Sequence, residues 1–260
     1  MIKTVTATEY IAPLREGGSL PAIIKADDGE LYAMKFVGAG QGPKALIAEL
    51  IAGEIARALD FRIPEIVLVA LDPAIGQAEP DAEIQDLLYA SAGINLGMRF
   101  LSHSSTFNLI APPAPSAEFA SRLVWFDAFV TNVDRTPRNV NMLIHHNEIW
   151  LIDHGASLYF QHNWQDHFKQ AETPFAMVRD HVLLKLADRL QAADAFAKEK
   201  LNAALFENLT AGIPDTWLME NEKFAGKDEH RRGFVEFLDH RLKNSHIFIE
   251  EANRARAERL

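Results

Sequence analysis

The chain has 260 residues, of which 48% are hydrophobic and 24% charged, and its formal net charge is -10. A chain of this size can bury one large core or the cores of two small lobes. The acidic balance argues against non-specific nucleic-acid binding, which needs a basic surface, although a few cations in a cleft would still bind a nucleotide. The chain has no cysteine, so disulfides, thiolate catalysis and cysteine-bound zinc are excluded.

The N-terminus has neither the long apolar region nor the cleavage-site pattern of a signal peptide. No apolar run approaches the roughly 20 residues that a membrane span needs. We therefore expect a cytoplasmic protein without a membrane span.

Strand patterns dominate the first third of the chain. Residues 21–25 and 31–37 are apolar and β-like, and residues 27–30 between them, Asp-Asp-Gly-Glu, predict a hairpin turn. Residues 44–60 have apolar side chains at three- and four-residue spacing, which predicts a helix with one apolar face. Residues 66–71 form a short apolar run that is typical of a buried strand.

The middle of the chain gives mixed signals. Residues 72–95 predict no single element, whereas residues 97–101 predict a short strand. A proline-rich loop at 111–116 precedes a helix with an apolar face from Phe119 to Val130. A polar turn then joins two short predicted strands, at residues 140–144 and 149–152.

Helical patterns follow from about residue 175. The last predicted helix, residues 231–259, mixes both charge signs, which indicates a solvated face rather than a partner site. We predict an α+β fold with a strand-rich N-lobe over residues 1–97 and a helical C-lobe over residues 98–260.

A polar segment between the apolar helix and the first of these short strands carries the strongest chemical signal. Asp134 lies five residues before Asn139, and Asp153-His154-Gly155 follows at the end of the second short strand, residues 149–152. The intervening hairpin would bring Asp134, Asn139 and Asp153 to one edge. Asp and Asn are common in turns, but phosphoryl transfer needs this set: one carboxylate for the nucleophile's proton, and an Asn oxygen and a second carboxylate for magnesium.

A lysine lies in an apolar strand upstream. Strand alternation puts Lys35 on the same face as Ala33 and Val37, where its charge needs a partner. Nucleotide phosphates would supply one; the alternative is a lysine at a sheet edge that faces water. A glutamate on the following helix would pair with such a lysine, and periodicity leaves both Glu49 and Glu54 open.

Other motifs are weak or absent. Gly17, Gly18 and Ser19 could form a loop that covers phosphates, although a plain turn fits equally well, because neither G-x-G-x-x-G nor a Walker A sequence is present. The chain has no H-E-x-x-H, no G-x-S-x-G and no Rossmann fingerprint, and His145-His146 falls in the predicted hairpin turn.

Together these segments resemble the HipA-like kinases, in particular a compact single-domain branch that lacks the extra N-terminal region of the toxin. The resemblance covers most of the chain, and its most specific block is Asn132-Val133-Asp134-Arg135-Thr136. The other matching segments are Gly17–Ser19, Ala26–Gly29, Ala33–Phe36, Glu49, Ile63–Glu65, Gly97–Phe100, Pro137–Asn139 and Leu151–Gly155.

The resemblance implies a two-lobed fold similar to protein kinases and phosphatidylinositol kinases. It implies ATP and magnesium as cofactors and protein serine or threonine hydroxyls as acceptors. Lys35 would contact the α- and β-phosphates, with Glu49 rather than Glu54 as its ion-pair partner.

The resemblance also assigns the remaining site residues. Asp134 would be the catalytic carboxylate, Asn139 and Asp153 would hold magnesium, and Met98 to Phe100 would be the hinge that meets adenine. Two features depart from the patterns of known kinases. Ala48 stands where the family often has Asn, and the chain has no His-Arg-Asp sequence, so ordinary eukaryotic-type protein kinases fit poorly.

Two other functions stay open: a nucleotide-binding module with this fold but no turnover, and a kinase that acts on a small molecule or a lipid headgroup. The acidic charge makes membrane docking the weaker choice, because anionic lipid surfaces attract basic patches. We expect the choice of acceptor to depend on residues 102–118 and 156–180.

Overall fold

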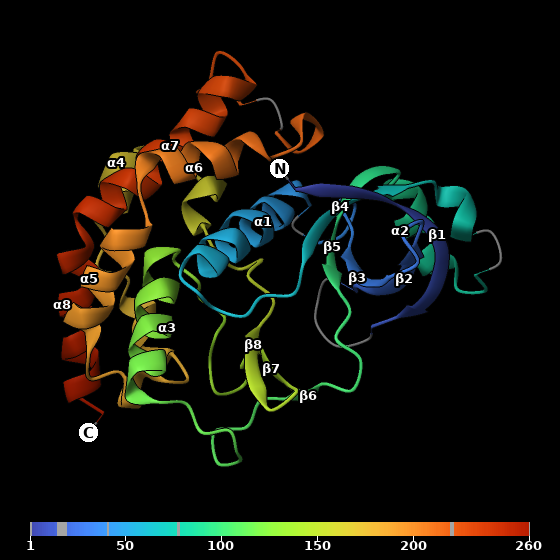
Figure 1. The fold of residues 1–260 in the computed structure, drawn as a ribbon. Coiled ribbons are helices and arrows are strands. Elements are labelled where there is room, and N and C mark those ends of the chain that lie inside the picture. The colour runs from blue at the N-terminus through green and yellow to red at the C-terminus, as the bar shows by residue number, and fades with distance from the viewer. Residues whose placement is uncertain (1, 15–19, 41, 77–78, 219–220, 260) are drawn as a thin grey trace.

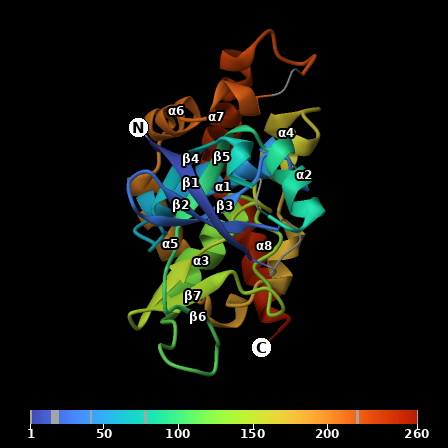
Figure 2. The same cartoon turned by 90° about the vertical axis from the view of Figure 1, so that its right-hand side faces the viewer.

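The computed structural model describes residues 2–14, 20–40, 42–76, 79–218 and 221–259. The fold is α+β. A barrel of strands lies at one end of the molecule and most of the helices lie at the other, with helix α1 between them (Figure 1). Figure 2 looks onto the molecule from the barrel side, with the helices behind it.

Five strands form the barrel in the order β1-β2-β3-β5-β4. Neighbouring strands are antiparallel except for β1 and β4, whose parallel pairing closes the barrel. The strands are β1 (Lys3–Pro13), β2 (Ala22–Ala26), β3 (Leu31–Lys35), β4 (Ile66–Leu71) and β5 (Gly93–Arg99).

The period of two along β3 decides where its lysine lies. Tyr32 and Met34 are buried in the core of the barrel, whereas Ala33 and Lys35 are only partly buried on the opposite face. Inside the barrel, Gly97 allows close packing, because a Cβ atom there would lie 2.8 Å from Cγ2 of Val69. The barrel interior is therefore filled, and Lys35 projects away from it.

Helix α1 (Pro43–Ala58) is buried around nearly its whole circumference, not along the one face that its periodicity predicts. It packs between the barrel and the helical part, so residues on several faces are covered. A Cβ atom at Gly53 would lie 2.5 Å from Cδ1 of Ile66, so a larger residue there would require the Ile66 side chain of β4 to shift.

The helical part also contains a small sheet, which includes the predicted hairpin. In this hairpin His146 and Asn147 have positive φ angles of 51° and 63°, as the two central residues of a type I′ turn require. The sheet contains β6 (Ser105–Thr106), β7 (Met142–His145) and β8 (Glu148–Leu151). The helices are α3 (Ala117–Phe129), α4 (His167–Ala171), α5 (Leu190–Lys200), α6 (Ala203–Ala211), α7 (Lys227–Lys243) and α8 (Ser245–Ala257).

Short 3-10 helices connect several of these elements, at Pro73–Gly76, Tyr159–His162, Ala176–Asp180, Leu184–Leu186 and Asp215–Trp217. Within the described ranges, no helix combines the length and the apolar character that crossing a membrane would need.

Further differences from the sequence predictions concern β1, α2 (Ala82–Ala90) and the last helix. Strand β1 was not predicted, and α2 lies in the segment for which no element was predicted. The predicted last helix is wrong as a single element, because Asn244 separates α7 from α8. The opposite face of α7 is buried, and it includes the fully buried Phe237 and Arg241.

Candidate active site

A buried carboxylate in α3 holds the loop that follows this helix. Asp127 Oδ1 accepts a hydrogen bond of 2.9 Å from Asn132, and Asp127 Oδ2 accepts one of 2.6 Å from Nε of Arg135. The Arg135 guanidinium is buried and also donates to the carbonyl oxygen of Asn141 at 2.5 Å. Both ends of the loop are thereby fixed to the same helix.

His181 completes this network from a distant part of the chain. Its Nδ1 accepts a hydrogen bond from the backbone N–H of Leu183 at 3.0 Å, so its Nε2 is the atom that donates to Asp127, at 2.9 Å. Burial alone would raise the pKa of Asp127, but the charge of Arg135 and the hydrogen bond from His181 outweigh burial and lower this pKa to about 2.

This depressed pKa predicts an acid-dependent loss of stability. Asp127 contributes stability above its unfolded-state pKa, and loses about 2 kcal/mol of it as pH falls through roughly 4 to 2. We expect urea unfolding of Asp127→Asn at pH 5, 4 and 3 to show a shallower pH dependence than the wild type. For the exposed control Asp86→Asn, the free energy of unfolding should change with pH as it does in the wild type. The same pH dependence in all three proteins would contradict this prediction.

The loop presents Asp134 next to two asparagines. Its Oδ2 accepts a hydrogen bond of 2.6 Å from Asn139 and a longer one of 3.4 Å from Asn141. Burial raises the pKa of Asp134 and the negative charge of Asp153 adds to the rise, whereas the asparagine hydrogen bonds oppose it. The side chain is therefore a more basic carboxylate than an ordinary aspartate.

Lys35 joins the barrel to the other two elements of the site. Its Nζ lies 2.5 Å from Oε2 of Glu49 on α1 and 2.6 Å from Oδ1 of Asp153 after β8. The Glu49 side chain is fully buried, whereas 43% of the Asp153 side chain is exposed, so a ligand can still reach Asp153. Burial would lower the pKa of Lys35, but the two carboxylates outweigh it and raise this pKa above its usual range.

Of the two candidate glutamates, Glu49 is the one that contacts the lysine. Glu54 pairs instead with Arg57 on the same helix, at 3.2 Å. Burial would raise the pKa of Glu49, but the charge of Lys35 and the contacts with His154 hold it well below its usual range. Glu49 is therefore ionised in the folded protein.

A cavity of about 270 Å³ opens beside these groups. Lys35, Asp134 and Asp153 line it together with the loop between β3 and α1. Met98 lies in β5 and Phe100 directly after it, and neither lines this cavity. Gly17, Gly18 and Ser19 lie outside the described residues.

The donor set near the cavity suits a hard cation. Asp153 supplies a partly exposed carboxylate and Asn139 an exposed amide, and magnesium prefers such oxygen ligands. Over the ranges that the structure describes, no three acidic or histidine side chains gather into a full protein cage. The residues therefore fit a magnesium ion that is held by one or two side chains together with phosphates, the usual arrangement for this ion.

The groups that hold the loop were not among the residues predicted from the sequence. Asp127 lies in an apolar helical segment, where a single carboxylate is a usable signal of a buried partner. Arg135 belongs to the recognised motif, but its inward direction is not visible in the sequence. His181 is 54 residues from Asp127, and no local pattern links the two.

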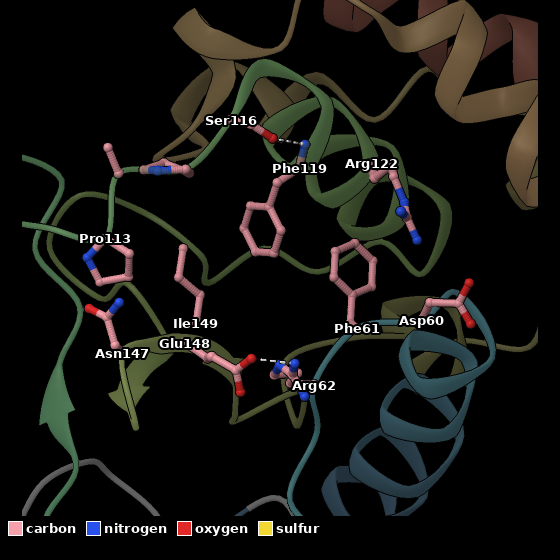
Figure 3. Close-up of a pocket in the computed structure, with 12 residues that line it drawn as sticks. Asp60, Phe61, Arg62, Pro113, Ser116, Phe119, Arg122, Asn147, Glu148 and Ile149 are labelled. Atoms are coloured by element: carbon pink, nitrogen blue, oxygen red, sulfur yellow. Dashed lines mark hydrogen bonds and ion pairs between the residues drawn. The ribbon is translucent and has the colours of Figure 1, made fainter.

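A second pocket, of about 380 Å³, shares no lining residue with the cavity at Lys35. Figure 3 shows the rings of Phe61 and Phe119 facing it, and these rings pack edge to face with centroids 5.6 Å apart. At its rim Glu148 pairs with Arg62, and Ser116 caps α3. This pocket lacks an acid–base set like that of Asp134 and Asp153.

The fold is similar to that of a known kinase. The crystal structure of the proinflammatory kinase CtkA of Helicobacter pylori matches with a TM-score of 0.59 and 13% sequence identity, over 98% of each chain. The Golgi casein kinase with Mn/ADP bound matches with a TM-score of 0.45 and 13% identity, over 96% of this chain and 73% of that one. No curated protein matches the chain in a sequence comparison.

The family model for HipA-like kinases matches residues 7–254, which is nearly the whole chain. The chain therefore belongs to the HipA-like kinase family. The resemblance predicted from the block Asn132–Thr136 is confirmed.

Proposed function

We propose that this protein is an ATP-dependent phosphotransferase that moves the γ-phosphoryl group of Mg-ATP to the hydroxyl of a protein serine or threonine. The observation that carries the proposal is the convergence at one cavity of Lys35 from the barrel with Asp134 and Asp153 from the helical part. Glu49 of α1 holds Lys35 from a buried position behind this cavity. Phosphoryl transfer is catalysed mainly by positioning and electrostatics, and these groups can supply both.

Lys35 binds the phosphates in this proposal. It stays protonated because two carboxylates stabilise its charge, and Glu49 fixes its position from a buried site. The cavity is small against the roughly 300–1,000 Å³ of pockets that enclose a drug-sized ligand, so it suits the phosphate end of the nucleotide. We assign adenine to Met98 and Phe100, and the covering of the phosphates to Gly17, Gly18 and Ser19.

Asn139 and Asp153 would hold magnesium, which neutralises phosphate charge when it is bound. Asp153 also pairs with Lys35, so the phosphate-binding cation and the magnesium carboxylate are held at a fixed separation before ligands bind. Asp134 orients the acceptor hydroxyl and accepts its proton. The raised pKa of Asp134 makes it a better base for that task.

We further propose that the molecule works as two lobes, divided near the predicted boundary between residues 97 and 98. Strand β5 continues to Arg99, so the connection to the helical part begins two residues later. The Lys35–Asp153 ion pair crosses this division. In this proposal the nucleotide phosphates and magnesium would bind between Lys35 and Asp153.

The test is transfer of radiolabelled γ-phosphate to the protein itself and to a lysate protein fraction, with magnesium present. We expect the wild type and the exposed control Asp86→Asn to label equally, and Asp153→Asn to label at a level near background. Labelling that survives Asp153→Asn would contradict the assignment of the active site to this cavity. Magnesium-dependent ATP binding without labelling would favour the nucleotide-binding module or a small-molecule acceptor.

A further inference from the structure

His154, directly after Asp153, is fully buried and has an unusual environment. Within the described part of the chain, neither of its ring nitrogens has a hydrogen-bond partner, although both are shielded from solvent. The ring packs edge to face on Phe126 with centroids 5.8 Å apart. A polar ring buried in this way costs stability, and an apolar ring would fill the same space at lower cost.

The polar edge of this ring faces the carboxylate that holds Lys35. Nδ1 of His154 lies 3.4 Å from Oε1 of Glu49, just beyond a well-formed hydrogen bond. The backbone N–H of His154 donates to both carboxylate oxygens of Glu49 at 3.0 Å. Lys35 contacts Oε2 of Glu49. Oε1 faces two groups, the backbone N–H and Nδ1 of the ring, and both belong to His154.

We infer that His154 is a positioning residue that orients Glu49 and, through Glu49, Lys35. This inference rests on the proposed phosphotransfer. A small closure of the gap would make Nδ1–H a donor to Oε1. Added to the backbone N–H of His154 and Nζ of Lys35, this further donor keeps the Glu49 carboxylate turned toward Lys35.

A purely structural role would make a different prediction. If the ring only filled space, His154→Phe would preserve function, because it retains an aromatic ring against Phe126. If the donor matters, His154→Asn should preserve function instead, because the asparagine amide nitrogen is the same number of bonds from Cα as Nδ1. The two variants thus separate the ring from the donor.

We would measure KM for ATP, kcat and Tm for the wild type, both variants and the exposed control His246→Phe. For His154→Phe we expect KM for ATP to rise about tenfold, which is about 1.4 kcal/mol, with a smaller change in kcat and a Tm no lower than the wild type. For His154→Asn we expect KM near the wild type and a lower Tm. The control should match the wild type in all three quantities.

An unchanged KM in His154→Phe, with the wild type active, would overturn the positioning role and leave the proposed function intact. A raised KM in both variants, together with a lower Tm in both, would show a structural role and also overturn it. A wild type that neither binds ATP nor transfers phosphate would overturn the proposed function and this inference together.

Discussion

Replacing Asp134 with asparagine is expected to lower kcat for phosphoryl transfer by about 10²–10⁴-fold, the usual range for loss of a general base. The substitution keeps the size of the side chain and removes the charge that, in the proposed mechanism, accepts the hydroxyl proton. The measurement is γ-phosphate transfer at saturating ATP. Because ATP is bound by other groups in the proposal, KM for ATP should change far less than kcat.

The same variant should be as stable as the wild type or more stable. The raised pKa of Asp134 shows that the fold disfavours its ionised form, through burial and through the charge of Asp153. Asparagine removes that repulsion, so Tm should not fall. A large drop in Tm together with the loss of activity would mean that Asp134 is structural, and retained activity would mean that another group accepts the proton.

A pH profile gives an independent check on the wild type. As the proposed base, Asp134 must be ionised to accept a proton, and burial raises its pKa above the roughly 3.9 of a free aspartate. The acid limb of kcat should therefore lie above that value. An acid limb at or below it would contradict the environment assigned to Asp134.

The sequence places the candidate site residues on particular elements by short-range rules. Alternation along one strand puts Lys35 on the same face as Ala33, and in the structure both lie on the face opposite the barrel core. The hairpin between Asn139 and Asp153 is set by its strand pattern and its turn. Both features depend on residues within about a dozen positions of each other.

The features that the sequence did not predict depend on packing between residues far apart in the chain. Periodicity could not choose between Glu49 and Glu54, because α1 is covered on several sides and has no single apolar stripe. The pairing of Asp127 with His181 joins residues 54 positions apart. Strand β1 is stabilised by pairing with β2 and β4, so its place in a barrel could not follow from its own residues.

Arg241 illustrates a buried charge that sequence patterns assign to solvent. It lies on α7 among charged residues, yet its side chain is fully buried, and the structure shows no carboxylate paired with it in the described residues. Burial lowers the pKa of Arg241 to about 9, so it remains protonated at neutral pH. Its guanidinium donates instead to backbone carbonyls, those of Ala128, Phe129, Ala171 and Thr173.

Replacing Arg241 with methionine is expected to destabilise the fold by about 3–5 kcal/mol, or roughly 10 °C in Tm. Methionine fills much of the space but leaves these buried carbonyls without donors, including those that end α3 just before the Asp134 loop. Thermal and urea unfolding would measure the change. Arg241→Lys should fall between the wild type and Arg241→Met, because lysine keeps the charge but lacks the planar fork of donors.

Arg232, exposed on the same helix, supplies the matched control. Arg232→Met should change the free energy of unfolding by no more than about 0.5 kcal/mol, as surface substitutions usually do. Equal effects at Arg232 and Arg241 would contradict the role assigned to the buried guanidinium. A large loss at Arg241 alone would show that one side chain of α7 stabilises the C-terminal end of α3, and so supports the loop that carries Asp134.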